Sequence, residues 1–155
     1  MKEIEIGRKF RDEMKNVAEK FGVDIFPPWK IPDSPWKERN QNPCDRIMGL
    51  DGRGYMIEMK RLIRNTEMKP DFARVKMIEM LREGQLKSLR KWASTGNQSL
   101  VILGQLQKHQ THQFLSVLHI LSIKPDGEEY LGGIPWGDPV GRKRILSEIF
   151  FGQGG

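Results

Sequence analysis

The stretch NPCDRIMGLDGRGYMIEMKRL, residues 42–62, predicts a β-hairpin from its pattern alone. Asp51-Gly52 is a strong signal for a tight turn between two strands. Glu58 and Lys60 stand within the apolar part of the second strand. Ionised groups are costly in a buried strand, so this pair needs a reason to be there. The two predicted strands are residues 44–50 and 54–61.

The turn decides which side chains face one another across the hairpin. If Asp51 and Gly52 alone form the turn, Asp45 lies directly opposite Glu58, whereas two other turn placements put Asp45 opposite Lys60. Strand side chains alternate between faces, so Asp45, Glu58 and Lys60 share one face in each case. A turn of three residues without a bulge would break this parity.

Two carboxylates and an ammonium on one face predict a metal site. Asp45 and Glu58 repel each other when both are ionised, and a divalent cation relieves that repulsion. Their oxygen atoms, together with the Met59 carbonyl, suit Mg²⁺ or Mn²⁺. Such an ion activates water and stabilises charge on a phosphodiester, and Lys60 can orient that water or neutralise developing charge. The alternative is an ordinary surface salt bridge on a half-exposed strand.

Length and composition limit the class of protein. The chain of 155 residues suits one domain, 1–155, with its own core. Its net charge of +6 favours an anionic partner, most commonly nucleic acid. The single cysteine, Cys44, excludes an internal disulfide and a cysteine-rich zinc site. No apolar run is long enough to cross a bilayer and no secretory leader is visible, so we expect an intracellular protein without membrane contact.

The rest of the chain predicts helices around a small sheet. Apolar spacing favours four helices, and two further apolar runs are typical of covered strands. The five prolines and two tryptophans between residues 23 and 43 predict an irregular loop. These elements give an α/β sandwich with a small sheet flanked by helices. The predicted helices are 7–22, 71–82, 85–95 and 141–151, the further strands are 99–104 and 114–123, and residues 124–139 are predicted as turns.

The order Asp45, hairpin, Glu58-Met59-Lys60 resembles the PD-(D/E)xK nuclease signature, with one residue inserted between Pro43 and the aspartate. Two more segments, GRKFRDEM (7–14) and EGQLKSLRKWASTGNQSLVILG (83–104), resemble Holliday-junction resolvases of the archaeal and RecU types. The resemblance covers residues 7–22 and 42–104. It implies a restriction-endonuclease-like fold and a homodimer that cuts branched DNA with Mg²⁺ or Mn²⁺.

Two further residues are candidates for the same site. At about 100° per residue, Glu13 borders the apolar stripe of the first helix, so we expect it as an added carboxylate near the metal. The alternative is an exposed helix glutamate. Gln85 lies on the apolar stripe of its helix, where a buried amide needs partners. Its predicted role is to bond the attacking water or the DNA backbone, and the alternative is a solvated helix start.

Basic residues after the hairpin are candidates for phosphate contacts, which position DNA without reading its sequence. Aromatic and basic residues also alternate in the proline-rich loop, where Trp29 and its neighbours either stack on bases or pin the loop to the protein. For any one basic residue, a solvated surface is the alternative. The predicted DNA-binding residues are Arg61, Arg64, Lys87, Arg90, Lys91, Trp36 and Lys37.

The combined prediction is a metal-dependent endonuclease that resolves four-way junctions. Two alternatives stay open: another nuclease of the same superfamily, or a DNA-binding protein of this fold without activity. Paired cuts need two active sites, which predicts a homodimer. The apolar residues expected at its interface are Phe114, Leu115, Val117, Leu118, Ile149, Phe150 and Phe151, with Trp29 and Trp36 as further candidates.

Overall fold

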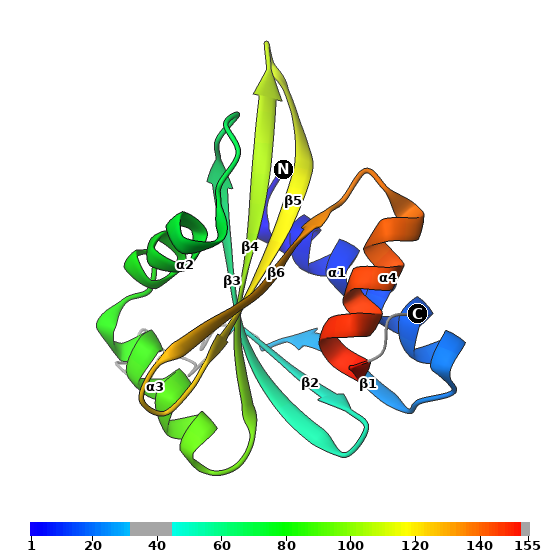
Figure 1. The fold of residues 1–155 in the computed structure, drawn as a ribbon, viewed down its shortest axis with the longest axis vertical. Coiled ribbons are helices and arrows are strands. Elements are labelled where there is room, and N and C mark those ends of the chain that lie inside the picture. Colours follow the sequence, from blue (N-terminus) through cyan, green and yellow to red (C-terminus); the bar gives the residue numbers. More distant parts are fainter. Residues whose placement is uncertain (32–44, 153–155) are drawn as a thin grey trace.

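The fold is α/β, with a six-stranded mixed sheet between two layers of helices (Figure 1). A computed structural model describes residues 1–31 and 45–152. In chain order the elements are α1 (Glu3–Phe21), β1 (Ile25–Lys30), β2 (Arg46–Leu50), β3 (Arg53–Ile63), α2 (Pro70–Glu79), α3 (Glu83–Ser94), β4 (Gln98–His109), β5 (His112–Ile123), β6 (Glu128–Pro135) and α4 (Pro139–Phe151).

The strands follow one another in the sheet in the order of the sequence, β1 to β6. Every neighbouring pair is antiparallel except β3 and β4, which are parallel. A parallel pair needs a long crossover connection, and α2 and α3 supply it. This crossover brings the start of α3 over β3, the strand that carries Glu58 and Lys60.

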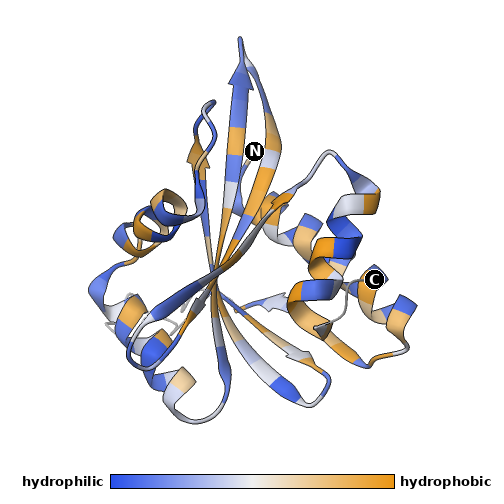
Figure 2. Ribbon diagram, viewed as in Figure 1, coloured by the Kyte–Doolittle hydropathy of each residue, from blue (hydrophilic) through white to orange (hydrophobic). Residues whose placement is uncertain are grey.

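Each face of the sheet buries its own apolar core. Ile57 and Met59 pack with α1 and α4, whereas Met56 packs with α2 and α3. Figure 1 shows the two helix pairs on opposite sides of the sheet. Hydrophobic residues concentrate along the middle of the sheet, and hydrophilic residues mark the tips of its hairpins (Figure 2). The predicted α/β sandwich is therefore confirmed.

The Asp51-Gly52 turn fixes the register of the hairpin. Both residues have positive φ, 50° and 76°, as a type I′ turn requires. Leu50 pairs with Arg53 across this turn, and the ladder continues to the pair Arg46 and Ile57. The prediction of a two-residue turn is confirmed.

The prediction of an irregular loop over 23–43 is wrong for residues 25–30, which form β1. Among the described residues, this strand lies at the edge of the sheet and pairs only with β2. Its register shifts between Phe26 and Trp29, across Pro27 and Pro28. Proline lacks the N–H that a ladder uses, and edge strands and bulges are the places that tolerate it.

The prediction of turns over 124–139 is also wrong, because residues 128–135 form the other edge strand, β6. Its register against β5 shifts between Ile120 and Leu121, beside Gly132 with φ 153°. A glycine accepts this backbone where another residue would be strained. The Gly132-Gly133 pair favoured a turn in the sequence. In the structure both glycines pair with β5, and Leu131 beside them is the extra residue at the register shift.

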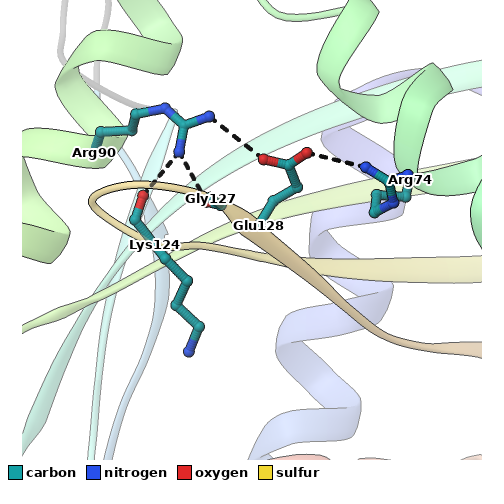
Figure 3. A network of polar contacts seen from close by, with 5 residues as sticks. All are labelled: Arg74, Arg90, Lys124, Gly127 and Glu128. Atoms are coloured by element: carbon teal, nitrogen blue, oxygen red, sulfur yellow. Dashed lines mark hydrogen bonds and ion pairs between the residues drawn. The ribbon is translucent and has the colours of Figure 1, made fainter.

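Polar contacts fix both crossover helices to the β5–β6 turn (Figure 3). The Arg90 guanidinium of α3 donates to the carbonyls of Lys124 and Gly127 at 2.9 and 2.8 Å. Glu128 pairs with Arg90 at 3.4 Å and with Arg74 of α2 at 3.1 Å. One carboxylate thus links α2, α3 and the turn, and holds the crossover in position over β3.

A buried polar chain joins the central strands to the segment that precedes α2. Gln105 of β4 donates from its amide to the carbonyls of Arg64 and Thr66 at 3.0 and 2.9 Å. Its oxygen lies 2.9 Å from His119 Nε2, and His119 Nδ1 lies 2.7 Å from the Tyr130 hydroxyl. Because the Gln105 oxygen can only accept, Nε2 carries the proton and the Tyr130 hydroxyl donates to Nδ1.

Within residues 1–31 and 45–152, no helix combines the length and the apolar character needed to cross a membrane.

Candidate active site

Asp45 and Glu58 face each other at the open end of the hairpin. Asp45 directly precedes β2, one step beyond the pair of Arg46 and Ile57. Its N–H donates to the Ile57 carbonyl at 3.1 Å, and its carboxylate accepts from the Met59 N–H at 3.0 Å. The Asp45 main chain thus bonds Ile57, the residue that pairs with Arg46, and the Asp45 carboxyl group interacts with that of Glu58.

Glu58 is a buried carboxylate, with only 2% of the residue exposed. It lies on the face of the sheet that α2 and α3 cover, as does Met56. The Lys60 ammonium lies 3.7 Å from Glu58 Oε1, and the Gln85 amide donates to the same oxygen at 2.8 Å. Such burial does not fit an ordinary surface salt bridge.

Gln85 of α3 connects the two charged residues of β3. Its oxygen accepts from Lys60 Nζ at 3.2 Å and from the Arg82 N–H at 3.0 Å, while its amide nitrogen donates to Glu58. The bond to Arg82 belongs to the capping box that starts α3. The start of the helix therefore also orients the charged pair. Gln85 is partly buried at the start of α3, and its side chain bonds protein groups of the site.

Burial and, second to it, the charge of Asp45 raise the pKa of Glu58 to about 8, and the charge of Lys60 opposes this rise by less. The free site therefore favours a proton on Glu58 at neutral pH. A positive ion beside both carboxylates acts in the opposite direction and favours their ionised forms.

The residues present fit Mg²⁺ or Mn²⁺. Carboxylate oxygens of Asp45 and Glu58 are the ligands that these ions prefer. The Met59 N–H bonds Asp45, and both main-chain groups of a strand residue point to the same neighbouring strand. The Met59 carbonyl is thus directed to the side of β3 on which Asp45 lies. In the described part of the chain, no group of three His, Cys, Asp or Glu side chains converges. Mg²⁺ commonly uses one or two carboxylates with waters and substrate phosphates.

The structure does not bring Glu13 to this site. Glu13 is buried on α1, as its place beside the apolar stripe predicted, but α1 covers the opposite face of the sheet. Its carboxylate lies 3.3 Å from Arg142 Nε of α4. The predicted role near the metal is therefore wrong. The sequence could not reveal it, because Arg142 meets Glu13 only when the first and last helices pack together.

The predicted DNA contacts separate into distinct environments. Lys87 and Lys91 are exposed on α3, the helix that carries Gln85. Arg61 lies on the face opposite Glu58, since it has the parity of Met59. The remaining arginines have partners within the protein: Arg64 stacks on Phe72 at 4.5 Å, and Arg90 belongs to the network of Figure 3. Trp36 and Lys37 lie outside the described residues, as does Cys44.

Arg46 is a charged core residue that the sequence reasoning missed. It is buried beside Asp45 on the face of Ile57, and a Cβ on Gly7 of α1 would overlap its guanidinium. Burial lowers the pKa of Arg46, while the charges of Asp45, Glu3 and Glu58 oppose that shift. The signal was available, because alternation along β2 puts an arginine on the core face.

No family model matches this chain, and no curated protein matches it either. The resemblance to PD-(D/E)xK nucleases therefore rests on the motifs in residues 7–22 and 42–104. Within those segments, Asp45, Glu58, Lys60 and Gln85 meet in space, and Glu13 does not join them.

Proposed function

We propose that this protein is a divalent-metal-dependent endonuclease that cuts phosphodiester bonds in branched DNA. One observation supports this most strongly: Asp45, Glu58, Lys60 and Gln85 converge from a hairpin and a separate helix. An ordinary surface salt bridge would not require that Glu58 be buried, or that the Gln85 amide bond both Glu58 and Lys60. Core positions normally avoid such groups unless a function requires them.

The residues divide the chemistry between them. Asp45 and Glu58 hold Mg²⁺ or Mn²⁺, with the Met59 carbonyl beside them. The ion, when bound, supplies Lewis-acid stabilisation of the charge that develops on the phosphodiester. Lys60 carries the positive charge that orients water or neutralises the leaving oxygen. Gln85 is a positioning residue, because it bonds Lys60 and Glu58 together at 3.2 and 2.8 Å.

Charge and resemblance together favour branched DNA as the substrate. The net charge of +6 favours a polyanion, and Lys87 and Lys91 are exposed on the helix that carries Gln85. The segments that resemble Holliday-junction resolvases imply a homodimer acting on four-way junctions. A two-fold dimer presents two active sites to the two strands that must be cut.

A nicking assay on three substrates tests the proposal: a four-way junction, a linear duplex and a single strand, each with Mg²⁺, Mn²⁺, Ca²⁺ or EDTA. We expect cleavage of the junction with Mg²⁺ or Mn²⁺ and none in EDTA. Ca²⁺ prefers more ligands and longer bonds, so activity falls with it. Asp45→Asn, Glu58→Gln and Lys60→Ala each lower the rate on the order of 100-fold or more. Junction binding stays largely intact.

Exposed residues provide matched controls for these variants. Glu79→Gln on α2 and Lys69→Ala before it remove charges outside the site, so we expect wild-type rates from both. Near wild-type cleavage by Asp45→Asn or Glu58→Gln would contradict the metal site. Equal cleavage of linear duplex or single strand would indicate another nuclease activity. Junction binding without cleavage under any of these metals would indicate a DNA-binding protein without activity.

A further inference from the structure

A basic groove lies between α1 and the edge strand β1, on the face of the sheet opposite Glu58. Its volume is about 510 Å³. The cations along it are Arg8, Arg11 and Lys15 of α1, Lys30 of β1 and the buried Arg46 of β2, and none of the described residues that line it is acidic. Arg11 also pairs with exposed Asp12 at 3.0 Å, a surface contact worth little. The groove therefore attracts anions along its whole length.

Two aromatic side chains are exposed in the same groove. Phe26 is 56% exposed and Trp29 is 51% exposed, although large aromatics usually bury most of their surface. Both lie on β1, on either side of the register shift at Pro27 and Pro28, and both line the groove. Proline at these positions stiffens the strand, so the two rings are held on a rigid support.

The groove ends beside the candidate active site. Lys30 pairs with Arg46 across β1 and β2, and the Ile31 N–H donates to the Asp45 carbonyl at 2.9 Å. The end of the groove at Lys30 is therefore next to the main chain of Asp45. The groove lies on the α1 face of the sheet, and Glu58 lies on the other.

We propose that this groove binds a single-stranded segment of nucleic acid, with unpaired bases stacked on Phe26 and Trp29 and phosphates along Arg8, Lys15 and Lys30. Aromatic faces beside a row of cations are the combination that single-strand binding uses. Duplex DNA keeps its base faces stacked inside the helix and offers nothing to these rings, so the rings favour unpaired nucleotides over duplex. The identity of the strand as DNA, and its supply at a branch point, rest on the proposed function.

Binding of a fluorescent oligo-dT of about 16 nucleotides, measured by anisotropy in EDTA, tests this site without any cleavage. We expect Trp29→Ala and Phe26→Ala each to weaken binding roughly 5- to 150-fold, the range for loss of one stacked base. Phe114→Ala is the matched control, because Phe114 is a half-exposed aromatic at the tip of β5. We expect this variant to bind oligo-dT with wild-type affinity.

Salt dependence tests the cations separately. For single strands, the slope of log K against log salt becomes shallower by about 0.7 for each phosphate that the protein no longer neutralises. Arg8→Ala and Lys30→Ala each reduce the slope by about that amount, and Lys69→Ala leaves it unchanged. Unlabelled duplex of the same length competes poorly with the oligo-dT.

Three results would contradict the proposal that this groove binds single-stranded nucleic acid. They are wild-type affinity in both aromatic variants, equal competition by duplex, and a change from dimer to monomer in sedimentation of Trp29→Ala. The last would make the groove an interface between copies of the chain. Failure of the nuclease proposal looks different, since a protein that binds oligo-dT through Trp29 and cuts nothing keeps the groove and loses the activity. A protein that cleaves the junction, and whose Trp29→Ala and Phe26→Ala variants bind oligo-dT as tightly as wild type, keeps the nuclease proposal and loses the groove.

Discussion

Glu58 carries the largest electrostatic cost of any residue in the candidate site. Its carboxylate is removed from water and lies beside the carboxylate of Asp45, so ionisation is opposed twice. Lys60 and Gln85 offset part of that cost. Breaking a buried pair usually destabilises a protein, whereas an uncharged isostere that keeps the hydrogen bonds often does not. Glu58 is therefore a residue where function and stability favour different side chains.

We expect Glu58→Gln to raise the free energy of unfolding of the metal-free protein on the order of 1 to 2 kcal/mol. The new side chain still accepts from the Gln85 amide and can donate to the Asp45 carboxylate. Folding of the variant at neutral pH also no longer has to protonate a carboxyl group that is ionised in the unfolded chain. Urea unfolding of both proteins at neutral pH in EDTA measures this difference. Exposed Glu79→Gln is the control and changes little. A Glu58→Gln protein less stable than wild type would mean that the charge contributes to the fold.

Gln85→Ala removes three hydrogen bonds at once, to Glu58, Lys60 and the N–H of Arg82. We expect the cleavage rate to fall about 10- to 100-fold, as with groups that orient metal ligands. The free energy of unfolding falls by about 1 to 3 kcal/mol, because buried partners lose their bonds. Rates against Mg²⁺ concentration separate the two effects. A large loss of rate with an unchanged unfolding curve would mean that Gln85 touches the substrate directly.

The local signals that predicted the site were those of a hairpin and a helix. The Asp51-Gly52 turn fixed the register that brings Asp45 to Glu58, and the helical period put Gln85 among apolar neighbours. The same period correctly put Glu13 at the border of the core. It could not tell which face of the sheet α1 would cover, because that depends on contacts between distant elements. The helical period can therefore predict that a charged residue such as Glu13 is buried, but it cannot predict which residue pairs with it.

At the scale of elements, the two strands absent from the sequence prediction are the two edges of the sheet. Central strands such as β4 are buried over most of their length and contain a continuous apolar run, residues 100–103 in β4. The edge strands β1 and β6 contain Pro-Pro and Gly-Gly, which usually mark turns. An edge tolerates these residues, because one side of the strand needs no partner and bulges absorb the irregularity. The prediction therefore worked best in the middle of the sheet.

The chain of Gln105, His119 and Tyr130 makes the sheet sensitive to acid. Burial lowers the pKa of His119 to about 4, from 6.5 in the unfolded chain. Between these values the unfolded state binds more protons than the native state, so stability rises with pH there. The contribution is complete above pH 6.5 and is lost as pH falls toward 4. A shift of this size corresponds to about 3 kcal/mol.

We therefore expect the free energy of unfolding to decline as pH falls from 6.5 to 4, and to decline less in His119→Gln. Urea unfolding at a series of pH values in EDTA provides the slope. Exposed His109→Gln, at the tip of β4, is the control and keeps the wild-type slope. Equal slopes in wild type and His119→Gln would show that His119 does not govern this range.

For the whole molecule, the residues expected at a dimer interface are largely used by the chain itself. Leu115 and Leu118 are buried in the core, and Phe150 and Phe151 pack against it. Phe114 alone among the β5 candidates is substantially exposed. The sequence indicated an apolar surplus, but it could not show that α4 would return to α1 and bury it. The homodimer remains part of the proposed function, supported by the symmetry of the substrate.

Light scattering at micromolar concentration tests the assembly, with and without four-way junction DNA. We expect a dimer in both conditions, because paired cuts need one Asp45–Glu58–Lys60 set from each chain. Mixing wild type with Glu58→Gln should give heterodimers that nick one strand and leave the junction joined. A protein that stays monomeric on the junction and nicks one strand per encounter would contradict the resolvase proposal and leave a simpler nuclease.

The prolines of β1 also bear on solubility. An exposed sheet edge presents free N–H and C=O groups on which another chain can add a strand, the first step of aggregation. Neither Pro27 nor Pro28 has an N–H to donate to an added strand, and the register shift across them interrupts the straight edge that such a strand would need. The dipeptide that made β1 resemble a loop in the sequence thus protects the open side of the sheet from uncontrolled growth.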